Sequence, residues 1–231
     1  MSQNVVNPYR YAVTGFDKSN ILVYYKFDET SGTVLTNYAT TGNGFSDGLG
    51  GNNDGTNASG VTVNVSGIID KAFDYDFSAD GYTQIDAQVW EGSGDYSVNL
   101  WLYHTLESGN EAVLVGGTNQ DLVAYQGSTG LIGAGNTPIL KCTTDAPLNT
   151  WFMLSYTRSG TDATVYFNGS SENTGTNSTT INGGAWTIGG ALTDIGENWH
   201  GRVDEFCFAD RVFSADEITE LYNSGSALSL V

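Results

Sequence analysis

The chain has 231 residues and a formal net charge of −18, from 26 acidic and 8 basic residues. Nucleic-acid binding needs a cationic surface that this composition does not supply, and an anionic membrane surface is unattractive for the same reason. Hydrophobic residues make up 39% and aromatic residues 12%, enough for a substantial core. The N-terminal segment lacks the pattern of a signal peptide, and no membrane-spanning segment is recognised, so we expect no membrane insertion.

Residues 1–20 are expected to form an N-terminal arm. This segment is apolar and aromatic, but Pro8 interrupts it and favours an extended backbone at Asn7. Such an arm is expected to bury its side chains against another subunit, although folding back on its own domain is the alternative. The candidate contact residues are Val5, Val6, Tyr9 and Tyr11.

From residue 21 onward, short candidate strands alternate with turns rich in Gly, Asn, Asp and Ser, the pattern typical of a β-sandwich or barrel. In residues 96–104, Val98 and Leu100 share one face, while Trp101 and Tyr103 share the other. Strands are expected near residues 21–27, 61–65, 72–77, 82–86, 96–104, 111–115, 121–126, 130–133, 137–143, 151–157, 163–167, 185–188 and 201–208.

One helix is expected, near residues 215–223. Ser214 and Glu217 have the spacing of a capping box, in which each side chain satisfies a backbone N–H at the start of the helix. Ile218 and Leu221 fall on one face of that helix. Residues 226–231 follow it as a C-terminal tail.

Six sequence blocks follow one another along the chain: LVYYKFDETSGTVLTNYATTGNG, GIIDKAFDYDFSADGYTQID, DYSVNLWLYH, NTWFMLSYTRSGTDATVYFNG, WTIGG and HGRVDEFCFADRVFSADEITELYNSG. Taken together and in this order, they resemble the laminin-G-like domains of the concanavalin A-like lectin/glucanase superfamily over about residues 21–225. The resemblance implies an all-β jelly-roll sandwich of two curved antiparallel sheets with one short C-terminal helix. Residues 37–60 form a longer and more glycine-rich loop than this family pattern leads us to expect.

The resemblance also raises the question of catalysis, since some members of the superfamily are glycosidases with an E-x-D-x-x-E arrangement on one strand. A retaining mechanism needs two carboxyl groups about 5–5.5 Å apart. Asp204 and Glu205 are adjacent, so in a regular strand they would point to opposite faces. We therefore expect no enzyme, with a glycoside hydrolase as a remote alternative.

A structural calcium ion is a further implication of the resemblance, because relatives often hold one where the first and last strands meet. Asp204 is the preferred candidate ligand, helped by Asp28, Asn43 or Asp54, since calcium takes six to eight oxygen ligands. The alternative is that Asp204 is a hydrogen-bonded carboxylate and the others are turn residues.

Sugar binding would require exposed aromatic rings, and the candidates are Trp101, Tyr103 and Trp199. The alternative is that these rings form a second small core under loops. His104 and His200 are too few for a zinc site and are expected to be ordinary polar strand residues.

An acidic jelly roll with an apolar arm favours a non-catalytic structural, decoration or adhesion subunit on the surface of a virus particle, by analogy with phage virions. Its expected partners are other virion subunits or copies of itself, bound through the arm, and cell-surface glycans. A free carbohydrate-binding module is the alternative, and an extracellular location elsewhere would fit it. Cys142 and Cys207 are expected to be small buried side chains, with a single bridge between them left open.

Overall fold

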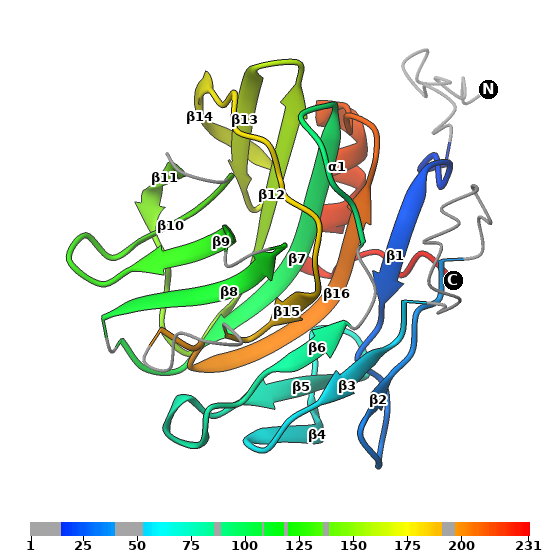
Figure 1. Ribbon diagram of the computed structural model, residues 1–231, viewed down its shortest axis with the longest axis vertical. Helices are drawn as coiled ribbons and strands as arrows, with labels where there is room; N and C mark the ends of the chain where they lie inside the picture. Colours follow the sequence, from blue (N-terminus) through cyan, green and yellow to red (C-terminus); the bar gives the residue numbers. More distant parts are fainter. Residues whose placement is uncertain are drawn as a thin grey trace, which may run out of the picture.

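Within the residues that the structure describes, the protein is a sandwich of two antiparallel eight-stranded sheets with one short α-helix near the C-terminus (Figure 1). This computed structural model confirms the predicted all-β fold class and is consistent with a jelly roll. It describes residues 15–39, 53–85, 89–107, 109–117, 120–135, 139–190 and 197–231. The arm candidates Val5, Val6, Tyr9 and Tyr11, and the candidate calcium ligand Asn43, lie outside these residues.

The first sheet, called sheet A, holds the longest strands of the fold. In spatial order, the strands of sheet A are β14 (Ser170–Thr176), β13 (Asp162–Phe167), β12 (Trp151–Ser159), β7 (Tyr96–His104), β16 (Gly201–Ala209), β5 (Lys71–Tyr75) and β4 (Val61–Ser66). In addition, β1 (Ile21–Tyr25) pairs with β16. The strand β14 was not expected, because its sequence is polar and it lies at the sheet edge with mostly exposed side chains.

The second sheet, called sheet B, packs against sheet A. Its strands, in spatial order, are β11 (Leu140–Asp145), β10 (Leu131–Ala134), β9 (Gln120–Gln126), β8 (Asn110–Gly116), β15 (Trp186–Ile188), β6 (Thr83–Ile85), β3 (Gly55–Asn57) and β2 (Val34–Leu35). The strands β2 and β3 were not expected either, because runs of two and three residues carry no recognisable alternation.

The main core fills the space between the two sheets. The predicted alternation in β7 is confirmed, because Val98 and Leu100 are buried in this core while Trp101 belongs to a separate cluster on the opposite face of sheet A. Cys142 lies in the main core and Cys207 in the separate cluster, and both are free thiols.

The separate cluster covers the outer face of sheet A, which we call the closed face. Helix α1 (Ala215–Tyr222) and the tail that follows the turn η2 (Asn223–Gly225) provide the cover. The sheet contributes Tyr24, Trp101, Met153, Tyr166 and Cys207, and the cover contributes Ile218, Leu221, Ala227 and Leu230. The Trp101 ring stacks on Tyr222 with centroids 5.7 Å apart and an interplanar angle of 11°.

The predicted capping box of α1 is confirmed. The Ser214 hydroxyl accepts from the Glu217 backbone N–H at 3.2 Å, and the Glu217 carboxylate accepts from the Ser214 backbone N–H at 2.8 Å. Arg211 also binds that carboxylate, at 2.6 Å. The start of the covering helix is therefore fixed by a local network. In the described part of the chain, no helix has the length and apolarity needed to cross a bilayer.

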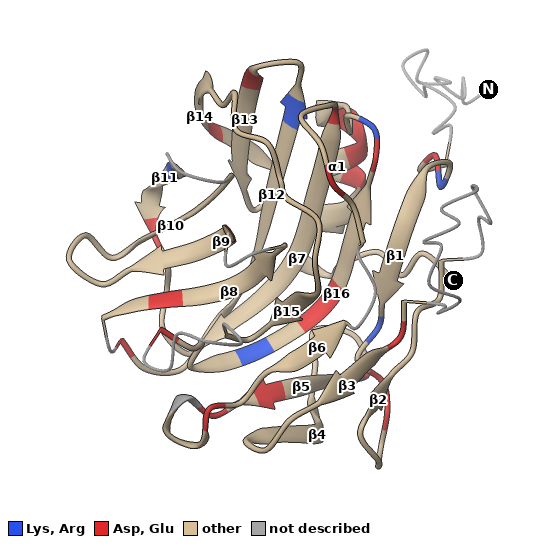
Figure 2. Cartoon of the chain, viewed as in Figure 1, with Lys and Arg blue, Asp and Glu red and all other residues tan. Residues whose placement is uncertain are grey.

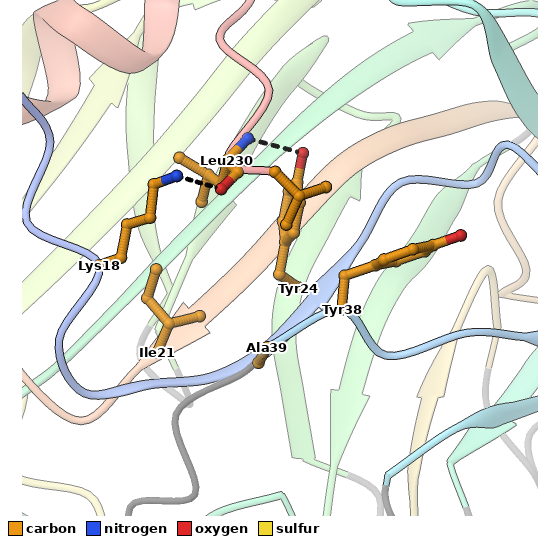
Figure 3. A pocket seen from close by; sticks show the side chains of 7 residues that line it. Lys18, Ile21, Tyr24, Tyr38, Ala39 and Leu230 are labelled. Atoms are coloured by element: carbon orange, nitrogen blue, oxygen red, sulfur yellow. Dashed lines mark hydrogen bonds between the residues drawn. The ribbon is translucent and has the colours of Figure 1, made fainter.

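The tail is held in place by hydrogen bonds as well as by apolar packing (Figure 3). The Leu230 backbone N–H donates to the Tyr24 hydroxyl at 3.0 Å, and the Lys18 ammonium donates to the Leu230 carbonyl. A pocket of about 30 Å³ remains beside these residues. That volume is close to one water molecule, so the closed face leaves no room there for a larger ligand.

Candidate functional site

The structure places Asp204 and Glu205 at a β-bulge in β16, where the pairing with β7 shifts register. Glu205 has a left-handed φ of 48°, which is uncommon for a residue with a side chain. Asp204 lies directly opposite Trp101, so it faces the closed face, and Glu205 reaches the Tyr24 hydroxyl on that same face. The expectation that these two carboxylates point to opposite faces is therefore wrong, because it assumed a regular strand.

Asp204 holds the turn between β4 and β5. Its Oδ2 accepts from the backbone N–H groups of Ile68 at 2.9 Å and Ile69 at 3.2 Å, while Oδ1 accepts from the Glu205 N–H at 2.9 Å. Its side chain is fully buried, and burial followed by the neighbouring Glu205 charge raises the pKa of Asp204 to about 9. These contacts match the hydrogen-bonded alternative given above.

Glu205 is almost as deeply buried, with 3% of its surface exposed. One carboxylate oxygen accepts from the Tyr24 hydroxyl, whereas the other, Oε1, has no hydrogen-bond partner. Burial raises the pKa of Glu205 to about 7, and the Tyr24 hydroxyl and the Lys26 charge oppose that rise. The pair therefore lies inside the protein, under the closed face.

The candidate calcium ligands come together only in part. Asp28 and Asp204 both bind the turn between β4 and β5, because Asp28 accepts from the Lys71 N–H at 3.1 Å. The other Asp28 oxygen binds the Lys26 ammonium at 2.6 Å, while Asp54 accepts from the Asn37 N–H at 2.8 Å.

Most of these carboxylate oxygens thus already accept hydrogen bonds from backbone N–H groups. The Lys26 ammonium binds the remaining Asp28 oxygen, which a calcium ion would otherwise take. The described residues therefore do not by themselves supply the shell of six to eight oxygens that calcium requires. Nor do they contain a group of three or more His, Cys, Asp or Glu side chains arranged to hold a metal ion. Calcium binding stays a prediction for this chain, and nothing below depends on it.

The candidate sugar-binding aromatics are largely inside the protein. Trp101 has 2% exposure and Trp199 has none, so neither ring offers a surface for stacking. Trp101 belongs to the second core considered as the alternative above, and Trp199 to the main core. Tyr103 is partly exposed, but its ring is covered by Arg202 at 5.0 Å and packs against Trp151 at 5.4 Å.

A buried cluster around His104 joins the two sheets and was not anticipated from the sequence. His104 is fully buried in β7, and its ring stacks on Trp199 with centroids 4.5 Å apart. Its Nε2 lies 3.3 Å from a Glu111 oxygen on β8, and the other Glu111 oxygen accepts from the His200 N–H at 2.9 Å. Because Glu111 comes from the other sheet, only the folded sandwich brings these residues together.

The outer face of sheet B, which we call the open face, contains a groove of about 170 Å³ over β8 to β11. A row of directly paired residues crosses these strands, consisting of Ala112, Ala124, Gly133 and Lys141. Neighbouring residues on the same strands, such as Val113, Tyr125 and Ile132, belong to the main core, so the row points outward. Ala112 and Gly133 are buried, and the partly exposed Ala124 lines the hollow, which we call the first groove.

Polar side chains edge the first groove. Gln126 and Lys141 lie on the same outward face, and the Lys141 ammonium donates to the Gln126 side-chain oxygen. Glu197 lies at the groove because its backbone carbonyl accepts a hydrogen bond from the Ala112 N–H. The following residue, Asn198, forms an isolated β-bridge with Ala112. The full lining is Asn110, Asp121, Ala124, Tyr125, Gln126, Ile139, Lys141 and Glu197.

The first groove therefore combines amides, carboxylates and one ammonium around the small side chain of Ala124. Amides and the ammonium can donate to ligand oxygens, while the carboxylates accept from hydroxyl groups. Basic residues are few over the whole sandwich, and acidic residues dominate (Figure 2). A concave site with several converging polar groups suits a ligand rich in hydroxyl groups.

Among solved structures, similar folds occur in an arabinanase, a sialidase and a mosquitocidal protein. Domain 4 of AbnA, a GH43 extracellular arabinanase from Geobacillus stearothermophilus solved with arabinotriose, is 18% identical, with a TM-score of 0.67 over 87% of this chain and 97% of that domain. A Trypanosoma rangeli sialidase is 13% identical, with a TM-score of 0.65 over 91% of this chain and 34% of the sialidase. The binding domain of Paraclostridial Mosquitocidal Protein 1 is 15% identical, with a TM-score of 0.66 over 90% of this chain and 53% of that chain.

These low identities show a shared fold, and a shared fold alone does not carry a function. No curated protein sequence matches the chain. A family model described as the concanavalin A-like lectin/glucanases superfamily matches residues 77–219, within the range over which the sequence blocks resemble that family. Because this match spans more than half of its residues, the chain belongs to the concanavalin A-like lectin/glucanase superfamily.

Proposed function

We propose that this protein is a non-catalytic glycan-binding domain and that the first groove is its binding site. The observation that carries the proposal is the hollow around the outward residue Ala124, which is edged by Gln126 and Lys141. Sugar rings need a surface that they can approach closely, together with polar groups that fix their hydroxyls. The first groove offers both.

The charge of the protein favours neutral glycans as ligands. At a net charge of −18, the chain repels polyanions at long range. Within the first groove, Asp121 and Glu197 add two carboxylates, against the single ammonium of Lys141. A neutral polysaccharide avoids this repulsion and can donate its hydroxyls to the carboxylates. The solved arabinanase domain with bound arabinotriose supports this choice of ligand class at the level of fold.

Catalysis has less support than binding. Asp204 and Glu205, the acid pair suggested by the sequence, are buried under the closed face at 0% and 3% exposure. In the first groove, Asp121 belongs to β9 and Glu197 to the segment that precedes β16, so they do not form a pair on one strand. The glycosidase arrangement that the resemblance implies is therefore missing at both places.

The proposal is tested by measuring binding and turnover on one panel of polysaccharides. Isothermal titration with arabinan, β-glucan, galactan and the polyanion alginate is expected to show binding to a neutral polymer and none to alginate. Incubation with the same polymers should release no reducing sugar. Gln126→Ala should weaken binding about tenfold, because it removes a polar edge of the groove. An exposed control on sheet A, Thr62→Ala, should bind like the unmodified protein.

A protein that binds no member of this panel would contradict the proposal, as would hydrolysis of any of them. The narrower placement on the surface of a virus particle stays a prediction. It rests on the apolar arm, whose residues 1–14 lie outside the described residues. Deleting residues 1–13 should leave a folded domain that no longer assembles, and normal assembly of the truncated protein would remove the main support for that placement.

A further inference from the structure

A second groove lies on the same open face, over β3 and β6. Its volume is about 190 Å³, and its lining is Thr56, Asn57, Ala58, Tyr82 and Gln84. Thr56 pairs directly with Gln84, and the Ala58 N–H donates to the Tyr82 carbonyl at 2.9 Å. On the same strands, Ile85 belongs to the main core and Thr83 is fully buried, so the Thr56 and Gln84 side chains point outward.

The second groove differs from the first in its chemistry. Tyr82 is partly exposed and provides an aromatic ring, Gln84 an amide and Thr56 a hydroxyl. Its lining contains no charged side chain, whereas the first groove is edged by Lys141 and Glu197. An aromatic ring beside an amide and a hydroxyl suits the apolar face and the hydroxyls of an uncharged sugar.

The order of the strands fixes how the two grooves are related. In sheet B, β3 and β6 are separated from β8 to β11 by β15 alone. Adjacent strands lie about 4.8 Å apart, so the centres of the grooves are about four strand spacings, roughly 19 Å, from one another. A short oligosaccharide fills one groove, whereas a longer chain can reach both by crossing the covered positions of Val115 and Thr187.

We propose that a single neutral polysaccharide chain occupies both grooves, with one sugar packed on Tyr82 in the second. This inference rests on the proposed function of the first groove and adds a specificity for chain length. Linking two sites through one ligand turns the second contact into an intramolecular one, which strengthens binding without any change at the first site. The protein should therefore prefer polymers to short fragments of the same sugar.

The test compares a polymer with its trisaccharide on three proteins, by titration of the full chain. The unmodified protein should have a higher affinity for the polymer than for the trisaccharide when both ligand concentrations are expressed in moles of chain ends. Tyr82→Ala should weaken polymer binding about tenfold and leave trisaccharide binding unchanged, and Tyr82→Phe should restore the loss. Thr56→Trp places a large ring in the second groove from an exposed position and should weaken polymer binding as Tyr82→Ala does. Agreement between these two variants guards against a folding defect in either one.

The outcomes separate the two proposals. If the unmodified protein binds neither ligand, the proposed function fails, and this inference fails with it. If it binds both ligands and the Tyr82 and Thr56 variants retain full polymer affinity, the first groove stands and the second is overturned. Equal losses of affinity for polymer and trisaccharide in Tyr82→Ala would also overturn the proposal that one chain occupies both grooves. The reason is that the second groove cannot affect a ligand in the first groove that is too short to reach it.

Discussion

The two outer faces of the sandwich carry different side chains. The outer face of sheet A presents large apolar residues, such as Trp101, Met153 and Tyr166, and helix α1 and the tail bury them. The outer face of sheet B carries the small residues Ala112, Ala124 and Gly133 at the positions that cross its central strands. Ala112 and Gly133 are buried, whereas two grooves hollow this face, one beside Ala124 and one over β3 and β6.

This difference explains why one face is closed and the other open. Exposed large apolar patches are costly in water, so a sheet face that carries them needs a cover. A sheet face of small and polar residues does not need such a cover and can stay accessible to a ligand. The C-terminal segment, from Ser214 onward, thus covers one face, and the proposed binding site lies on the other.

The largest expected effect comes from damaging the closed face. Trp101→Ala removes a side chain that is 2% exposed and stacked on Tyr222, so it should lower the free energy of unfolding by about 3–5 kcal/mol. The melting temperature should fall by on the order of 10 °C. Below that temperature, the affinity for glycans should not change, because the first groove lies on the other sheet.

Thermal unfolding followed by circular dichroism measures this prediction, and Trp101→Phe is the matched control, with a smaller loss expected. An unchanged melting temperature in Trp101→Ala would show that the helix and tail do not depend on this contact. A loss of glycan binding in the folded variant would show that the two faces are not independent.

A smaller and pH-dependent effect is expected at Glu205, under the same cover. A carboxyl group whose pKa is higher in the folded protein than in the unfolded chain holds its proton more tightly when folded. Its stabilising contribution is present at low pH and is lost as the pH rises from the unfolded to the folded pKa. For Glu205 this range runs from its ordinary value of 4.5 to about 7.

Glu205→Gln removes the titrating group and retains an oxygen that can accept from Tyr24. We expect the variant to gain up to about 3 kcal/mol over the unmodified protein at pH 8 and nothing at pH 4. Urea unfolding across this pH range measures the difference, and the exposed Asp216→Asn serves as a control with an unchanged profile. Parallel profiles for Glu205→Gln and the unmodified protein would contradict this account.

The sequence predicted the closed face better than the open one, for physical reasons. The alternation in residues 96–104 places Trp101 outward, and the spacing of Ser214 and Glu217 predicts the start of the helix, because both signals are local. The bulge at Glu205 has no such signal, since a left-handed φ is seldom adopted by glutamate.

The grooves depend on pairing between strands. Ala112, Ala124 and Gly133 form a row only after β8, β9 and β10 have paired in one register. His104 and Glu111 likewise meet only when the two sheets pack together. Such long-range juxtapositions are set by tertiary structure, and composition or spacing in a single sequence does not reveal them.

The central claim is that the open face of sheet B binds the glycan. The most direct measurement is the affinity of Ala124→Trp for the neutral polymer that the unmodified protein binds best. This substitution fills the floor of the first groove and removes no hydrogen-bonding side chain. Thr62→Trp places the same ring at an exposed position on β4 of sheet A and is the matched control. We predict that Ala124→Trp abolishes binding while its fold and the control's affinity stay unchanged, whereas full affinity in folded Ala124→Trp would contradict the account.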